Sequence, residues 1–108
     1  MGFPVRLLVL GLGLIACKAD KQDCERATRN YATLTYWKTA DAEIARYPAD
    51  KREELRKRKM AQFTHELENG IDTLVSQCQS ANNTDMIECM IAAKTGEQAL
   101  ECAPLSTD

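Results

Sequence analysis

Pro48 separates two long segments in which apolar side chains recur every three or four residues. Before it lie Cys24, Ala27, Tyr31, Leu34, Trp37, Ala40, Ile44 and Tyr47; after it lie Met60, Phe63, Leu67, Ile71, Leu74 and Cys78. This period indicates amphipathic α-helices, and the residue before a proline avoids the helical region. The pattern predicts helices over about residues 23–46 and 50–80, folded as an antiparallel hairpin. Asp50 is the expected N-cap of the second helix, with Glu53 as its capping partner.

The remaining sequence predicts a second, shorter helical hairpin. One helix is expected from Thr84 or Asp85 to Lys94. Thr95 and Gln98 then form an expected capping pair, and about two helical turns follow before Pro104. Because β-branched residues are scattered rather than alternating, no strand is indicated. The expected fold class is all-α, with a long antiparallel hairpin and a short C-terminal hairpin.

Four of the five cysteines fall on the expected helices. Cys24 and Cys78 lie at similar distances from the first turn, and Cys89 and Cys102 lie about equally far from the second. Of the three possible connectivities, we therefore expect Cys24–Cys78 and Cys89–Cys102. Four free thiols are the alternative. A zinc site is disfavoured because the short C-x₂₋₄-C pair of structural zinc sites is missing.

Residues 1–16 have the pattern of a targeting segment. Arg6 is followed by ten uncharged residues and then by a polar stretch. A transmembrane helix needs about 20 apolar residues, whereas ten match a signal-peptide core. The segment Leu14-Ile15-Ala16-Cys17 resembles the lipobox of bacterial lipoprotein precursors, and that resemblance implies cleavage before Cys17 and acylation, as with palmitate, at this cysteine. An ordinary secretory signal cut near Ala16 or Ala19, or a retained anchor helix, is the alternative.

The same resemblance implies a membrane-anchored protein of the bacterial cell envelope. Lys18 follows Cys17, and by analogy with the enterobacterial sorting pattern this favours the outer membrane. Lipidation of Cys17 leaves an even number of cysteines, as expected for a disulfide-bonded chain in the periplasm or outside the cell. We divide the chain into a signal peptide at 1–16, a lipidated cysteine and short linker at 17–22, a helical domain at 23–104 and a frayed tail at 105–108.

The sequence contains no recognisable catalytic motif. His65 is the only histidine, and Asn69 stands where a zincin motif needs its second histidine. Neither a C-x-x-C motif nor a Gly-x-Ser-x-Gly motif is present. We therefore expect a non-enzymatic binding or structural module without cofactor or metal. Two alternatives stay open: a small enzyme or metal-binding periplasmic protein whose site is not evident from the sequence, and a purely structural spacer.

Cations gather around the expected turn of the long hairpin. Residues 46–59 contain seven basic and three acidic residues, whereas residues 60–108 contain one and eight. We define the basic tip as Arg46, Lys51, Arg52, Arg56, Lys57, Arg58 and Lys59. It is either a solvated helix surface with internal ion pairs or a contact surface for an anionic envelope polymer, a lipid or an acidic protein.

The expected hairpin places the basic tip about 35–40 Å from the anchored end. A signal peptide argues against nucleic acid as the partner. Three aromatic residues near the tip, Tyr36, Trp37 and Tyr47, are interpreted as core rather than as contact surface.

Overall fold

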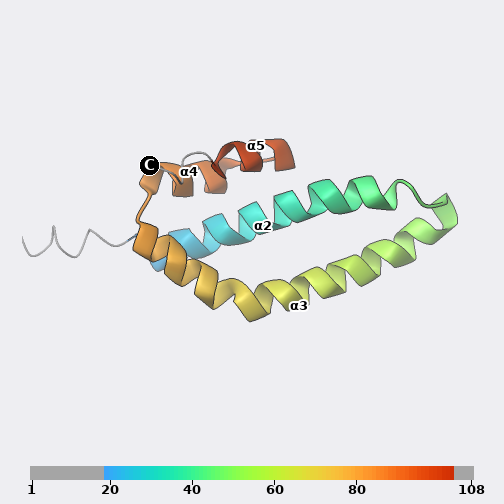
Figure 1. The fold of residues 1–108 in the computed structure, drawn as a ribbon, viewed down its shortest axis with the longest axis horizontal. Coiled ribbons are helices and arrows are strands. Elements are labelled where there is room, and N and C mark those ends of the chain that lie inside the picture. The colour runs from blue at the N-terminus through green and yellow to red at the C-terminus, as the bar shows by residue number, and fades with distance from the viewer. Residues whose placement is uncertain (1–18, 104–108) are drawn as a thin grey trace, which may run out of the picture.

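The computed structural model describes residues 19–103, which form four helices (Figure 1). Helix α2 (Lys21–Ile44) and helix α3 (Ala49–Ala81) form the long antiparallel hairpin. Helix α4 (Thr84–Ala92) and helix α5 (Gly96–Glu101) run back along the other side of α2. Helix α2 is therefore the central element, against which the other three pack. The predicted all-α fold with two hairpins is confirmed.

Several predicted assignments lie outside the described residues. These are the signal peptide at 1–16, the lipidation site Cys17 with the first part of its linker, and the tail at 105–108. Helix α2 begins at Lys21, two residues before the predicted start at 23, so the predicted linker at 17–22 overlaps the start of this helix.

The turn between α2 and α3 differs from the prediction at both ends. Helix α2 ends at Ile44 rather than Arg46, so Tyr47 lies in the turn and is 43% exposed. Helix α3 begins at Ala49 with Pro48 at its N-cap, and the predicted N-cap at Asp50 is wrong. The proline ring fixes φ near its value of −57°, which lets the helix start directly after it. Asp50 instead lies in the first turn, where its charge complements the helix dipole.

Side-chain caps start both helices of the short hairpin. The Asn83 side chain accepts a hydrogen bond from the Met86 backbone N–H at 3.0 Å. Thr95 Oγ1 accepts from the Gln98 N–H at 3.1 Å, which confirms Thr95 as the predicted cap. The Gln98 side chain reaches one residue further back than predicted, because its Oε1 accepts from the Lys94 N–H at 2.7 Å. Helix α4 ends at Ala92, two residues before the predicted end at Lys94.

Both predicted disulfides are confirmed. Cys24 and Cys78 join α2 to α3 with their Cα atoms 5.8 Å apart, and Cys89 and Cys102 join α4 to the end of α5 at 5.7 Å. The first bond lies in the main apolar cluster, whose buried members are Cys24, Ala27, Ile71, Val75 and Ile87. Three helices thus meet at the open end of the long hairpin, and the core is concentrated there.

Two contacts fix the short hairpin on α2. The Asn30 side-chain amide donates hydrogen bonds to the carbonyls of Met90 at 2.7 Å and Ala93 at 3.0 Å. These carbonyls lie at the C-terminal end of α4, where helix carbonyls lack intrahelical partners. Gly96 lies so close to α2 that an added Cβ would meet the Cβ of Lys38 at 2.7 Å. Only a residue without a side chain fits this approach.

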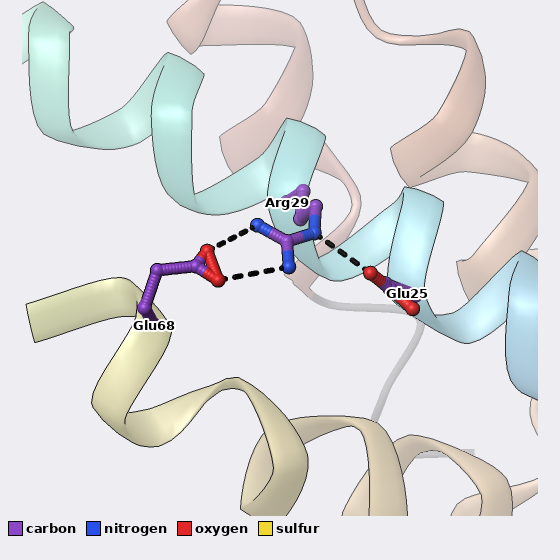
Figure 2. Close-up of polar contacts among 3 residues, drawn as sticks. All are labelled: Glu25, Arg29 and Glu68. Carbon is purple, nitrogen blue, oxygen red and sulfur yellow. Dashed lines mark hydrogen bonds and ion pairs between the residues drawn. The ribbon is translucent and has the colours of Figure 1, made fainter. Parts of the chain in front are cut away.

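An arginine connects the two long helices beyond the core (Figure 2). Arg29 on α2 donates to both carboxylate oxygens of Glu68 on α3, at 2.8 and 3.1 Å, and to Glu25 at 3.0 Å. Bidentate arginine–carboxylate pairs have a defined orientation as well as charge attraction. These hydrogen bonds from Arg29 hold the pKa of Glu68 below its ordinary value. They also raise the pKa of Arg29.

We expect acidification to weaken this connection. Because the pKa of Glu68 is depressed in the folded state from its ordinary value of 4.5, its contribution to folding stability is complete above that ordinary value and is lost as pH falls through the lower folded value. Urea denaturation between about pH 5 and pH 3 should therefore show a shallower loss of stability in Glu68→Gln than in the wild type. Glu66→Gln, which lacks an arginine partner, is the matched control. If the stability of Glu68→Gln falls with pH as steeply as that of the wild type, the pair with Arg29 does not lower the pKa of Glu68.

We expect the two disulfides to differ in their effect on stability. The paired cysteines are 54 and 13 residues apart in sequence. The chain-entropy relation then gives about 4 kcal/mol for the longer loop and about 3 kcal/mol for the shorter. Urea unfolding of the double serine variants Cys24→Ser/Cys78→Ser and Cys89→Ser/Cys102→Ser measures both values. A larger loss in the second variant would contradict the expected order.

Candidate functional site

The basic tip lies at the closed end of the long hairpin, opposite the end where the described chain begins (Figure 1). Helix α2 has 24 residues between these ends, which at 1.5 Å per residue gives about 36 Å. The structure brings the seven predicted cations to this end, but they serve different roles.

Arg52 stabilises the end of α2. Its Nε donates to the carbonyl of Tyr47 at 2.7 Å, and its terminal nitrogen donates to the carbonyl of Ala45 at 3.1 Å. Arginine side chains commonly satisfy the carbonyls at helix C-termini in this way. Arg52 therefore holds the turn in place, and its donors are directed at backbone rather than at solvent.

Arg56 and Lys59 connect α3 to α2. Arg56 pairs with Asp41 at 2.8 Å, and its guanidinium lies over the Trp37 ring, 5.3 Å from the centroid. Lys59 pairs with Glu43 at 2.9 Å, and its side chain is only 17% exposed. Both cations are neutralised by carboxylates that the preceding helix supplies, so they contribute little net charge to the tip surface.

Three cations remain without such a partner within the described residues. We call Arg46, Lys51 and Arg58 the free cations, because their side chains make no hydrogen bond or ion pair in this part of the chain. Lys57 has only a long 3.7 Å contact to Glu53 within its own helix, with both side chains more than three-quarters exposed. Exposed pairs of this kind are weak. The surface charge of the tip comes mainly from these four residues.

The aromatic residues near the tip divide between interior and surface. Tyr36 and Trp37 are half-buried, and Tyr36 stacks on Phe63 of α3 with ring centroids 4.5 Å apart. The Tyr36 hydroxyl also donates to the Lys59 carbonyl at 3.1 Å. Tyr47 is exposed in the turn, so its interpretation as a core residue is wrong.

The structure adds a groove that the sequence did not suggest. It has a volume of about 760 Å³, is mostly apolar, and follows one face of α2. On α2 it is lined at regular helical intervals by Thr28, Tyr31, Ala32, Thr35, Thr39 and Glu43, among others. The last turns of α3 and two methionines of α4, Met86 and Met90, form its walls at the open end of the hairpin.

The two ends of the groove differ in charge and polarity. Among the described residues only Glu43 and Lys59 give it charge, and both lie at its end toward the basic tip. At the other end it is lined by Leu74, Ala81 and the two methionines, and Leu74 remains 42% exposed there. The signal missed in the sequence is a row of small residues, alanine and threonine, beside the predicted apolar stripe of the first helix.

The residues considered for metal chemistry are not brought together. His65 is exposed on α3, and its Nε2 lies 3.2 Å from the Asn69 side-chain amide. In the described part of the chain, no three histidine, cysteine, aspartate or glutamate side chains are placed to hold a metal ion.

Over the same residues, no helix has the length and apolar character needed to cross a membrane.

We expect neighbouring arginines of the basic tip to differ in their effect on stability. Arg56→Ala removes the Asp41 pair and the Trp37 contact and should cost about 1 kcal/mol. Arg58→Ala removes no described contact and should change stability by less than about 0.5 kcal/mol. Urea denaturation of both variants decides this, and equal losses would show that the Arg56 contacts contribute nothing.

The comparisons with known proteins give no relative. The sequence matches no protein-family model, and no match was found to a curated protein or to a solved structure.

Proposed function

We propose that this chain is a lipid-anchored, non-enzymatic module of the bacterial cell envelope that contacts an anionic surface through its basic tip. The lipobox resemblance of residues 14–17 suggests the anchor. The observation that carries the contact is the free cations, which are exposed at the closed end of the hairpin and have no carboxylate partner among the described residues. This placement matches a rod whose tether and contact surface are at opposite ends.

The rigidity of the hairpin supports this assignment. A disulfide and the apolar cluster hold the open end, while Arg29, Tyr36, Arg56 and Lys59 connect the helices toward the tip. The backbone that carries these cations is already folded, so binding does not have to order it. The tip can therefore project its charge about 36 Å from the membrane surface.

A vesicle-bridging experiment tests the proposed contact. Full-length acylated protein in phosphatidylcholine vesicles is mixed with vesicles that contain phosphatidylglycerol, and bridging is followed by light scattering. Bridging should occur at low ionic strength and weaken with added salt, because exposed charges are screened. The triple variant Arg46→Glu/Lys51→Glu/Arg58→Glu should lose it, since only the free cations are reversed.

The matched control reverses the same number of charges elsewhere. Lys21→Glu/Arg26→Glu/Lys94→Glu changes the net charge equally but leaves the basic tip intact, and it should still bridge vesicles. Equal bridging by both triple variants would reject the basic tip as the contact surface. Mass spectrometry of the N-terminal peptide tests the anchor separately, and an unmodified Cys17 would reject it.

A further inference from the structure

We propose that the groove along α2 binds one long-chain fatty acid, with the hydrocarbon chain against α2 and α4 and the carboxylate at Lys59. The proposal goes beyond the anchor and the basic tip, because it assigns a ligand to the groove, which shares only Lys59 with the basic tip. Its basis is the size of the groove, its length and the position of its charged residues.

The groove has the dimensions of a site for a single hydrocarbon chain. Its volume of about 760 Å³ falls within the usual range of ligand pockets, about 300–1,000 Å³. The lining of α2 extends from Thr28 to Glu43, which corresponds to about 22 Å of helix. One acyl chain spans half of a bilayer core about 30 Å thick, or about 15 Å. The groove can therefore hold an extended chain with length remaining for a polar head.

The surface of the groove suits a flexible aliphatic ligand. Alanine and threonine on α2 leave a shallow floor, and Thr35 turns its hydroxyl to the Tyr31 carbonyl at 2.8 Å, so its methyl group is left for apolar contact. Met86 and Met90 line the opposite end. Methionine side chains are unbranched and adapt to irregular apolar surfaces. Leu74 adds apolar surface that no described residue covers completely.

The charges select the orientation and the sign of the head group. Lys59 has three N–H donors, and its one described ion pair, to Glu43, uses only one of them. Glu43 lines the same end and offsets the charge of Lys59. Residues 41–59, which include both carboxylates of α2 at this end, still have seven basic against five acidic residues, and this excess favours an anion over a cation. A carboxylate at this end can accept hydrogen bonds from Lys59 while its chain lies along the uncharged part of the groove.

This orientation agrees with the proposed anchor, and only this point rests on the proposed function. An anchored open end would lie at the membrane, so the tail of the ligand would point toward the membrane and its head away from it. A lipid in a leaflet has the same orientation. The lining residues of α2 follow one face of this helix, which suits a single chain better than a two-chain phospholipid.

Photo-cross-linking with palmitic acid that carries a diazirine in its chain tests the proposal. Full-length protein in phosphatidylcholine vesicles is irradiated with the probe, digested and analysed by mass spectrometry. Adducts should form on peptides containing Tyr31, Leu74 and Met86, should saturate, and should be displaced by unlabelled palmitate. Hexadecanol, which lacks the charge, should compete at least about tenfold less well.

Two matched variants separate groove binding from general partition into the membrane. Ala32→Trp fills the groove floor and should abolish the saturable adducts. Ala61→Trp places the same side chain on an exposed position of α3 outside the groove lining and should leave them unchanged. Circular dichroism checks that both variants are folded, and the competition series on the wild-type protein decides the question independently of either variant.

The outcomes distinguish this proposal from the anchor. Non-saturable labelling, equal labelling of the two variants, or equal competition by hexadecanol and palmitate would overturn it. Displacement by phosphatidylglycerol but not by palmitate would overturn the fatty acid as ligand. The same digest reports acylation of Cys17, so saturable groove labelling without acylation would remove the anchor and retain the groove.

Discussion

The bond between Cys24 and Cys78 and the small apolar cluster around it are the constraint on which the rest of the structure depends. Among the described residues, five form the buried part of that cluster, and a small domain with so small a cluster commonly depends on covalent cross-links. Here the cross-link and the cluster coincide at the open end of the hairpin. They bring α2, α3 and α4 together, and the remaining length of the hairpin extends from that junction.

The two ends of the molecule are consequently held by different forces. The main apolar cluster lies at the open end. Toward the turn, the burial of Ile44 is supplemented by backbone capping by Arg52, the aromatic contact of Tyr36 and the ion pairs of Arg56 and Lys59. Ion pairs at exposed positions are individually weak and respond to salt. The tip should therefore open locally more easily than the junction does, although the two share the same helices.

Much of this architecture could be predicted from the sequence. The apolar period and Pro48 gave the long hairpin, and equal distances from the two turns gave both disulfides. Local capping was less predictable. Pro48 is the N-cap of α3 and makes no side-chain cap hydrogen bond, whereas the sequence pattern predicted such a cap from Asp50.

The roles of the cations and the existence of the groove could not be predicted, because both depend on tertiary placement. Arg56 and Arg58 are equivalent in the sequence pattern, yet only Arg56 faces Asp41 across the hairpin. Similarly, the threonines and alanines of α2 resemble an ordinary helix side. They line a groove only because α3 and α4 approach α2 from its flanks.

The tight approach of Gly96 to Lys38 has a consequence for how this chain can vary. The backbone of α5 rests directly on α2 at that point, and the disulfide at Cys102 lies only six residues further along. A side chain at position 96 would lift the start of α5 while the cross-link to Cys89 keeps its other end in place. The short hairpin would then have to tilt about the Cys89–Cys102 disulfide. The distance between the start of α5 and α2 therefore depends on the absence of a Cβ atom at position 96.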